Sequence, residues 1–193
     1  MTSQERRAVR SLALLYAFRL LGLFMVLPLL AIYAADMPGA TPTMIGLALG
    51  IYGLSQALLQ IPLGWLSDRL GRKPIIIGGL IVFGLGSLLA ASADSVGGIV
   101  LGRALQGAGA IASTVMALVA DLTWAQQRTK AMALVGMSIG LSFALALVIG
   151  PLVASVGGLA GVFVFTALLA AIGVVIVLFL VPTPTSKQSS DEA

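Results

Sequence analysis

The sequence predicts an all-α membrane protein with six transmembrane helices. First, 59% of its residues are hydrophobic and 9% are charged, whereas about 25% of residues are charged in an ordinary soluble domain. Second, apolar runs recur from residue 11 to residue 181, and each approaches the roughly 20 residues that a helix needs to cross a bilayer. Third, the polar breaks between these runs are short, so successive helices are expected to lie antiparallel and side by side.

The polar breaks define six expected spans. These cover residues 11–33, 44–66, 74–93, 96–120, 131–155 and 159–181. Residues 1–10 are expected to form a cytoplasmic N-terminus, and residues 11–181 the six-helix bundle. Residues 182–193 are rich in Pro and Ser, which is typical of a flexible linker or a disordered tail.

The positions of Lys and Arg predict the orientation of the bundle. Of the 11 basic residues, only Arg19 and Arg103 lie inside spans. The other nine fall on the side shared with the N-terminus, and they are Arg6, Arg7, Arg10, Arg69, Arg72, Lys73, Arg128, Lys130 and Lys187. Because short cytoplasmic loops retain Lys and Arg, both termini are expected in the cytoplasm, in a protein of the inner membrane. Two termini on one side also require an even number of spans.

Composition also excludes several classes of function. The chain contains no Cys and no His, so it has no thiol nucleophile and no imidazole to bind a metal or shuttle protons. We therefore expect neither an enzyme nor a bound metal or cofactor. The net charge is +4, and it is divided among short loops. This pattern indicates membrane topology and no nucleic-acid partner.

Polar residues inside the spans predict an internal pathway. A guanidinium in a membrane costs at least ~2.5–3.5 kcal/mol, so Arg19 and Arg103 should face the bundle interior or a wet cavity. Their placement in the first and fourth spans suggests an inverted 3+3 repeat. The expected substrate or proton pathway consists of Arg19, Tyr52, Gln56, Gln60, Arg103 and Gln106. Hydrogen bonding between helices is an equal alternative for the glutamines, and it is the expected role of Ser138 and Ser142.

The linker between the second and third spans carries the most specific motif. Residues 64–74 read GWLSDRLGRKP, in which glycines permit close helix approach and a turn, and charged residues supply hydrogen-bonding partners. The motif resembles the cytoplasmic loop signature of the major facilitator superfamily at all its fixed positions. Residues 120–128, ADLTWAQQR, are similar to a second cytoplasmic motif of that family, with Gln127 in place of the usual Glu.

The resemblance implies that the two motifs form a gate that holds the outward-open state by charge pairing. Its expected members are Gly64, Asp68, Arg69, Gly71, Arg72, Lys73, Asp121 and Arg128. The alternative is an anchor that only fixes topology.

Two further segments match family patterns. Residues 103–110, RALQGAGA, match a motif of the fourth span, which implies a role for Arg103 in proton coupling or substrate binding. Gly150-Pro151 partly matches the antiporter signature of the fifth span and predicts a kink.

The first two spans resemble the YajR-like branch of the drug:proton antiporters. The similarity implies an exporter of small molecules that acts as the N-terminal six-helix half of a two-bundle carrier. Its partners would be the lipid bilayer, a small-molecule substrate and a second six-helix half, either a separate chain or another copy. A different class of function is a truncated fragment or a membrane interaction subunit without transport activity.

No carboxylate lies well inside any span, although proton carriers normally need one. The acids are Glu5, Asp36, Asp68, Asp94, Asp121, Asp191 and Glu192. Either Asp36 or another peripheral acid carries the proton, or the carrier lies in a second half, or transport is not driven by protons. The two buried arginines would also suit an anionic group on the substrate.

Overall fold

The computed structural model describes residues 3–182, which contain helices and no strand. The α-helices are α1 (Ser3–Tyr33), α2 (Pro42–Leu70), α3 (Arg72–Ala91), α4 (Val96–Ala108), α5 (Ala112–Asp121) and α6 (Arg128–Leu180). Two short 3-10 helices, Ala34–Asp36 and Ala125–Gln127, lie in the connections. The prediction of an all-α membrane protein is confirmed, because five helical segments of the described chain are long and apolar enough to cross a bilayer.

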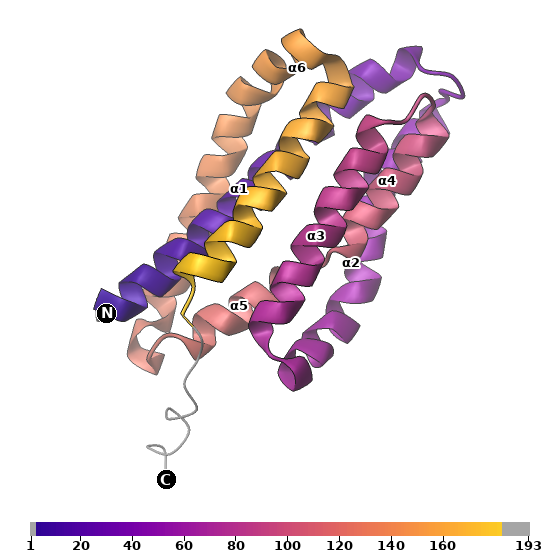
Figure 1. Cartoon of the computed structure of the whole chain (residues 1–193). Helices are drawn as coiled ribbons and strands as arrows, with labels where there is room; N and C mark the ends of the chain where they lie inside the picture. The colour runs from indigo at the N-terminus through magenta and orange to yellow at the C-terminus, as the bar shows by residue number, and fades with distance from the viewer. Residues whose placement is uncertain (1–2, 183–193) are drawn as a thin grey trace.

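Helix α6 contains two crossings. Its 53 residues include Gly158, whose φ of 60° and ψ of −156° are not helical and whose backbone conformation is open essentially to glycine alone. The chain reverses there, so that the first arm of α6 (residues 128–157) and the second arm (residues 159–180) run side by side in Figure 1. Helices α4 and α5 together form one crossing, and α1, α2 and α3 form one each. With the two arms of α6, the helices are consistent with the expected six crossings.

Two differences from the expected spans exceed the end shifts of at most four residues found elsewhere in the described chain. Helix α1 begins at Ser3, eight residues earlier than the first predicted span, because Glu5 in its first turn is held by the backbone amide of Trp124, at 3.0 Å from Oε1. The fourth span, predicted as one helix, is interrupted between Ala108 and Ala112. A sequence motif rich in Gly and Ala predicts close packing, and it gives no signal for this interruption.

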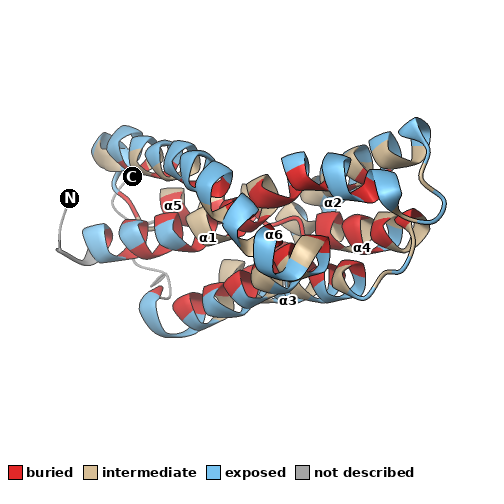
Figure 2. Cartoon of the chain, turned by 90° about the horizontal axis from the view of Figure 1, so that it is seen from above, coloured by how far each residue is buried: buried red, intermediate tan, exposed pale blue. Residues whose placement is uncertain are grey.

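The helices pack in two groups. Helix α1 packs against both arms of α6, and α2 and α3 pack against α4, while α3 also packs against α6 and so joins the two groups. Numbered as membrane spans, the first span packs against the fifth and sixth, and the fourth span packs against the second and third. Each group therefore contains one helix from the opposite three-span repeat, and exchanging the repeats leaves the pattern unchanged, as an inverted repeat requires. Buried residues lie between the helices and exposed residues lie on their outer faces (Figure 2).

Glycines allow the second group to pack closely. A Cβ atom on Gly107 would overlap the carbonyl oxygen of Tyr52, and one on Gly109 would overlap that of Gly79. Small residues at helix interfaces are the usual means of bringing membrane helices together, because lipid provides no hydrophobic driving force between them.

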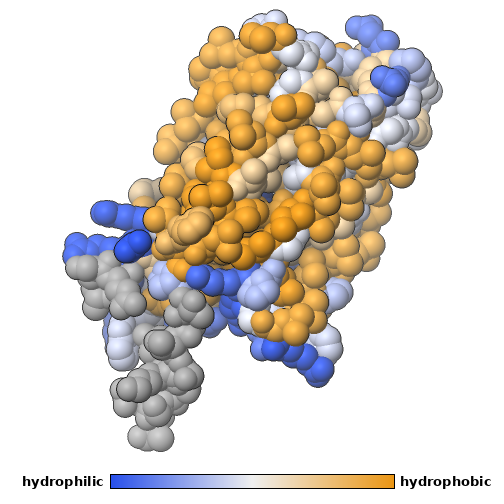
Figure 3. All heavy atoms as spheres, viewed as in Figure 1, coloured by the Kyte–Doolittle hydropathy of each residue, from blue (hydrophilic) through white to orange (hydrophobic). Residues whose placement is uncertain are grey.

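The basic residues gather at one end of the bundle. Helix α1 begins at this end, α6 finishes there, and the turn between α2 and α3 lies there too (Figure 1). Figure 3 shows hydrophilic surface at this end and a hydrophobic band above it. The described part of the chain thus agrees with the charge distribution predicted from the sequence, while Lys187 lies outside the described residues.

We predict that Gly107→Ala will destabilise the bundle and that Gly140→Ala will not. The added methyl at position 107 would overlap the backbone of α2, whereas nothing lies within 4 Å of a Cβ at position 140. Overpacking of this kind costs about 1–3 kcal/mol. Thermal unfolding of the purified protein in detergent measures the difference. Equal midpoints for the two variants would contradict the close packing described at position 107.

Candidate functional site

Arg19 of α1 lies at the centre of the bundle with 1% of its surface exposed. Its Nη2 donates to Gln56 Oε1 of α2 at 3.1 Å and to the carbonyl oxygen of Gly109 at 3.2 Å. Gly109 follows the end of α4. Because the helix is interrupted there, the Gly109 carbonyl is available to a side chain, and the interruption therefore contributes an acceptor for a buried cation.

Arg103 of α4 is fully buried, and it forms a second set of hydrogen bonds. Its Nε donates to the carbonyl oxygen of Ala48 at 3.2 Å, and its Nη1 donates to Gln106 Oε1 at 2.9 Å. Gln106 Nε2 in turn donates to Ser87 Oγ of α3 at 2.7 Å. These bonds connect three helices through groups that are all removed from lipid.

Tyr52 of α2 lies between the two arginines. Its hydroxyl donates to Gln56 Oε1 at 2.7 Å, and its ring lies 4.6 Å from the Arg103 guanidinium carbon. Similarly, the guanidinium carbon of Arg19 lies over the ring of Phe83 on α3, 5.2 Å from the ring centre. Such cation–π contacts stabilise a guanidinium by about 2 kcal/mol or more when it is desolvated. The arginines, Tyr52 and the glutamines 56 and 106 thus form one connected polar network.

Neither buried arginine has a carboxylate partner within residues 3–182, where the ion pairs involve only Arg72. Arg19 Nε and Arg103 Nη2 are buried and make no hydrogen bond to a described group. A buried charge that lacks a counter-charge is costly, and inside a membrane protein such groups usually mark a functional site. The network therefore has an excess of donors and positive charge.

Gln56 connects this network to the surface of α2. The guanidinium of Arg19 has donors only, so the Gln56 side chain turns its acceptor oxygen, Oε1, toward Arg19 and its Nε2 away from it. Gln56 is partly exposed, and its Nε2 has no partner among the described groups. Gln60, one turn further along, contributes only its backbone, whose carbonyl oxygen accepts from Ser113 Oγ at 3.3 Å.

Of the two serines of the fifth span, only Ser142 has an acceptor on another helix. Its Oγ lies 3.0 Å from the carbonyl oxygen of Ala17 on α1 and 2.7 Å from that of Ser138 on its own helix. Ser138 Oγ donates within its own helix, to the carbonyl oxygen of Val135 at 2.7 Å.

Arg72 is the centre of the predicted gate. Its guanidinium pairs with Asp68 at 2.5 Å and with Asp121 at the end of α5 at 3.1 Å, and it donates to Ser67 Oγ at 2.7 Å. The two carboxylates come from different segments, so Arg72 ties the α2–α3 turn to the end of α5. The side chains of Asp68 and Asp121 are 58% and 42% exposed. Exposed pairs of this kind contribute little, about 0–1 kcal/mol each.

The glycines of the motif have separate structural roles. Gly71 connects α2 to α3 with φ of 94°, a value that favours glycine over other residues. A Cβ atom on Gly64 would contact Ser113 Oγ at 3.4 Å, so the glycine permits a close approach of α2 to α5.

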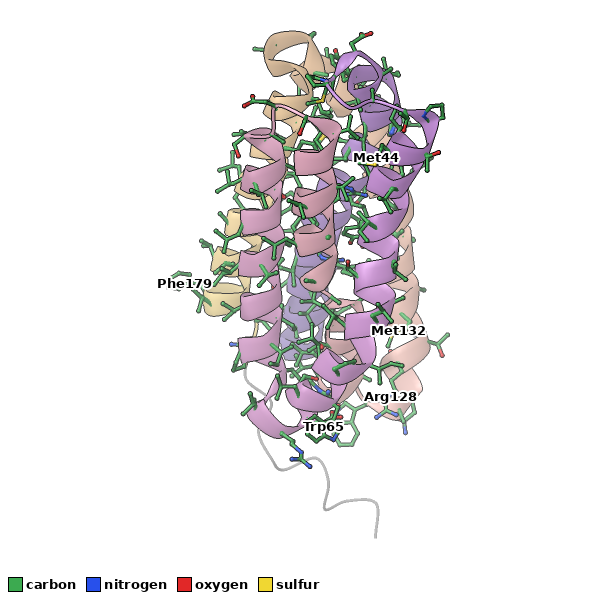
Figure 4. The ribbon with its side chains drawn as sticks, turned by 90° about the vertical axis from the view of Figure 1, so that its right-hand side faces the viewer. Met44, Trp65, Arg128, Met132 and Phe179 are labelled. Carbon is green, nitrogen blue, oxygen red and sulfur yellow. The ribbon has the colours of Figure 1, made fainter. Side chains whose placement is uncertain are left out.

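The remaining basic residues of the predicted gate lie outside the Arg72 cluster. The Arg69 guanidinium stacks on the Trp65 ring at 3.9 Å, while Lys73 and Arg128 form no ion pair with any described residue. Figure 4 places Trp65 and Arg128 at the same end of the bundle, opposite Met44. Arg128, an expected member of the gate, therefore lies outside the ion pairs that Arg72 forms with Asp68 and Asp121.

Gly150 and Pro151 lie in the first arm of α6. Gly150 is buried, and a Cβ there would lie 3.4 Å from side-chain atoms of both Met25 and Leu29 on α1. Pro151 is exposed within the helix. Gly150 thus belongs to the contact between α1 and α6, and neither Gly150 nor Pro151 takes part in the hydrogen bonds of the arginine network.

Sequence reasoning missed four contributors to these sites. Ser87 was detectable as a polar residue in an apolar span, and Ser67 lies within the motif. Phe83 and the Gly109 carbonyl gave no signal, because an aromatic residue in a span is usually packing and a carbonyl becomes an acceptor only where a helix is interrupted.

Comparison with known proteins identifies the family. The profile of the Major Facilitator Superfamily matches residues 12–193. The chain therefore belongs to the Major Facilitator Superfamily, and it is a multi-pass membrane protein of that family. This confirms the resemblance predicted from the loop and fourth-span motifs.

Individual relatives share this fold. The chain is 53% identical over 193 residues to the inner membrane transport protein YajR of Escherichia coli (strain K12), which covers the whole chain and 42% of that protein. It is 38% identical over 117 residues to the class B tetracycline resistance protein of Escherichia coli, covering 60% of this chain and 27% of that one. The human organic anion transporter MFSD10 (TETRAN) superposes with a TM-score of 0.78 at 22% identity, over 95% of this chain and 49% of that one. The chain spans less than half the length of these relatives.

We predict that Gln106→Leu will lower the stability of the bundle more than Gln60→Leu. The first change removes the partner of Arg103 Nη1 and of Ser87, whereas the side chain of Gln60 forms no hydrogen bond to a described residue. Hydrogen bonds to charged groups are worth about 1.5–3 kcal/mol. Equal losses in thermal unfolding would show that the buried network does not stabilise the fold.

Proposed function

We propose that this bundle is one half of a secondary transporter that exports small molecules across the inner membrane. The observation that carries the proposal is the pair of buried guanidiniums, Arg19 and Arg103, with no carboxylate partner in the described chain. The described contacts of both guanidiniums are neutral oxygens and aromatic rings, which leave the positive charge without a counter-charge. An excess of buried positive charge favours a complementary group supplied from outside the bundle.

The complementary group would be an anion or an acceptor-rich part of the substrate, or an acid of a second half. Gln56 Nε2 is a donor without a described partner at the partly exposed edge of the network, and Arg103 Nη2 is another inside it. A substrate carrying a carboxylate, phosphate or sulfonate would satisfy such donors. Arg19, Tyr52, Gln60 and Gln106 would orient these two side chains or line the path to them.

A second six-helix half completes the proposed carrier, either as a separate chain or as another copy. Helix α2 and the first arm of α6 expose many large apolar side chains, among them Leu54, Leu58, Met137 and Leu141. In the most apolar stretch of α2, only 11% of the residues are buried. A second bundle against these faces would enclose the edge of the polar network that a lone bundle leaves open to lipid.

The Arg72 cluster is proposed to act as a reversible gate at the cytoplasmic side. Because its ion pairs are exposed and individually weak, they can break when the two halves rock against each other. Arg69, Lys73 and Arg128 would then face the second half or the headgroups. The basic end of the bundle would be cytoplasmic by the positive-inside rule, with both termini on that side.

Export is supported by similarity to a tetracycline resistance protein and by the partial antiporter signature at Gly150 and Pro151. Coupling to protons would require a carboxylate from the second half or from a peripheral position such as Asp36, because the spans themselves hold none.

We predict that Asp68→Asn will abolish export and that Arg103→Ala will abolish export of anions, while both variants still insert in the membrane. The first removes one partner of Arg72 and the second removes a central donor. Efflux from intact cells of two fluorescent probes, anionic fluorescein and cationic ethidium, would measure the loss, with membrane amount checked by immunoblot.

Lys130→Ala is the matched control, because Lys130 is exposed at the same end and outside the cluster. Unchanged export in both test variants would remove the roles assigned to the network and to the gate. Loss of anionic but not cationic probe export in Arg103→Ala is the pattern expected for an anion site.

A further inference from the structure

Glu5, in the first turn of α1, is a buried carboxylate that belongs neither to the arginine network nor to the Arg72 cluster. Only 6% of its surface is exposed, and acidic side chains are almost never buried to this extent unless a partner satisfies them. Its Oε1 accepts a hydrogen bond from the backbone N–H of Trp124 at 3.0 Å, across 119 positions of sequence. Glu5 thus links the start of α1 to the connection between α5 and α6.

Trp124 lies where the chain leaves α5. Its backbone is extended, with φ of −61° and ψ of 149°, and it precedes the short helix Ala125–Gln127. The other hydrogen bonds described for residues 122–127 join residues three or four apart in sequence. Apolar side chains of α1 and α5 belong to one packed cluster, so the two helices are in contact. To this packing Glu5 adds a directional bond from a distant part of the chain.

The same connection directly follows Asp121, the last residue of α5. Asp121 pairs with Arg72 at 3.1 Å, and this ion pair joins α5 to the turn between α2 and α3. The pair is partly exposed and therefore weak. A weak pair forms only where the backbone already holds both side chains within reach, because it cannot offset the entropy of ordering the chain. The path of the chain just after Asp121 therefore matters for the pair.

Two simpler roles of Glu5 depend on its charge alone. A carboxylate in the first turn of a helix stabilises that helix through the macrodipole, and it attracts neighbouring guanidiniums such as those of Arg6 and Arg7. An exposed carboxylate would serve either role. Neither role explains why Glu5 is buried or why it accepts a hydrogen bond from Trp124.

We propose that Glu5 is a positioning residue for the Arg72–Asp121 ion pair. By holding the Trp124 N–H, it fixes the point at which the chain leaves α5 and so keeps Asp121 within reach of Arg72. The role of Glu5 rests on the proposed function only in that this ion pair serves there as part of a gate. The contact lies inside the chain, so it does not require any outer face of the bundle to remain uncovered.

Hydrogen–deuterium exchange of the full chain in detergent, measured by mass spectrometry, tests this role in two segments. Residues 122–127 report on the connection itself, and residues 67–73 report on the far side of the ion pair. Glu5→Ala is expected to speed exchange in the first segment by about tenfold, because a hydrogen bond to a charged group is lost. It is expected to speed exchange in the second segment by about two- to fivefold, because a weak ion pair is lost.

Three further variants separate positioning from charge. Asp121→Asn should match the effect of Glu5→Ala on residues 67–73, and the double variant should exchange there no faster than Asp121→Asn alone. Glu5→Gln keeps an acceptor oxygen without the charge and should stay close to wild type. Arg6→Ala is the matched control, because Arg6 is the neighbour of Glu5 but is exposed, and it should leave residues 67–73 unchanged.

The donor of the hydrogen bond can be removed as well as the acceptor. Trp124→Pro deletes the backbone N–H at a φ that proline adopts, whereas Trp124→Ala removes the same indole ring and keeps the N–H. Only the proline variant should speed exchange in residues 67–73. Gel filtration and circular dichroism check that each variant is folded, and the Glu5 variants decide the question if the proline variant is not.

Four results would overturn the proposal. Unchanged exchange of residues 67–73 in Glu5→Ala would show that Glu5 acts only on its own connection. Equal effects of Glu5→Gln and Glu5→Ala would mean that charge alone matters. Faster exchange in the double variant than in Asp121→Asn would mean that Glu5 does not act through the ion pair. Equal exchange in the two Trp124 variants would exclude the N–H.

The exchange measurement requires no transport. A failure of the gate would therefore appear separately, as unchanged export by Asp68→Asn, while the exchange results still decide the role of Glu5.

Discussion

One buried side chain, Arg19, provides a polar link between α1 and the helices α2 and α4. The helices form two groups, α1 with α6 and α2, α3 with α4. Apolar packing of α3 on α6 joins these groups, and Arg19 extends from the first group into the second. It donates to Gln56 on α2 and to the Gly109 carbonyl where α4 ends. A lone guanidinium in a membrane is costly, so these acceptors must be in place for α1 to pack as it does. The interruption after α4 is therefore part of the site.

Two kinds of electrostatic interaction operate in the molecule, and their strengths suit different tasks. The network of Arg19 and Arg103 is removed from water, so its hydrogen bonds are strong and expensive to break. The Arg72 cluster is exposed, so its pairs are weak and easily exchanged. A carrier whose halves rock about a fixed centre needs a rigid interior and a gate that opens at small cost. The proposed function assigns these two roles accordingly.

The sequence predicted the membrane fold and the buried arginines, because composition and charge spacing are direct consequences of the bilayer, while the gate role of the Arg72 cluster stays a prediction. The turn at Gly158 was placed correctly between the fifth and sixth spans. The interruption at Gly109 was not predicted, because glycine within an apolar run is as typical of close packing as of a broken helix. Tyr52 and Gln56 belong to the network, whereas the side chain of Gln60 does not. This difference depends on the rotation of α2 about its axis. Arg128 forms no ion pair with a described residue, and the short helix at Ala125–Gln127 separates it in sequence from Asp121.

The central claim is that the Arg19 side chain couples the two helix groups through Gln56. A double-mutant cycle of Arg19→Met and Gln56→Leu, measured by the free energy of unfolding of the purified chain in detergent, tests it most directly. We predict that the two changes are not additive, with a coupling energy of about 1–3 kcal/mol. Additive losses within about 0.5 kcal/mol would show that the two side chains act independently and would contradict the account.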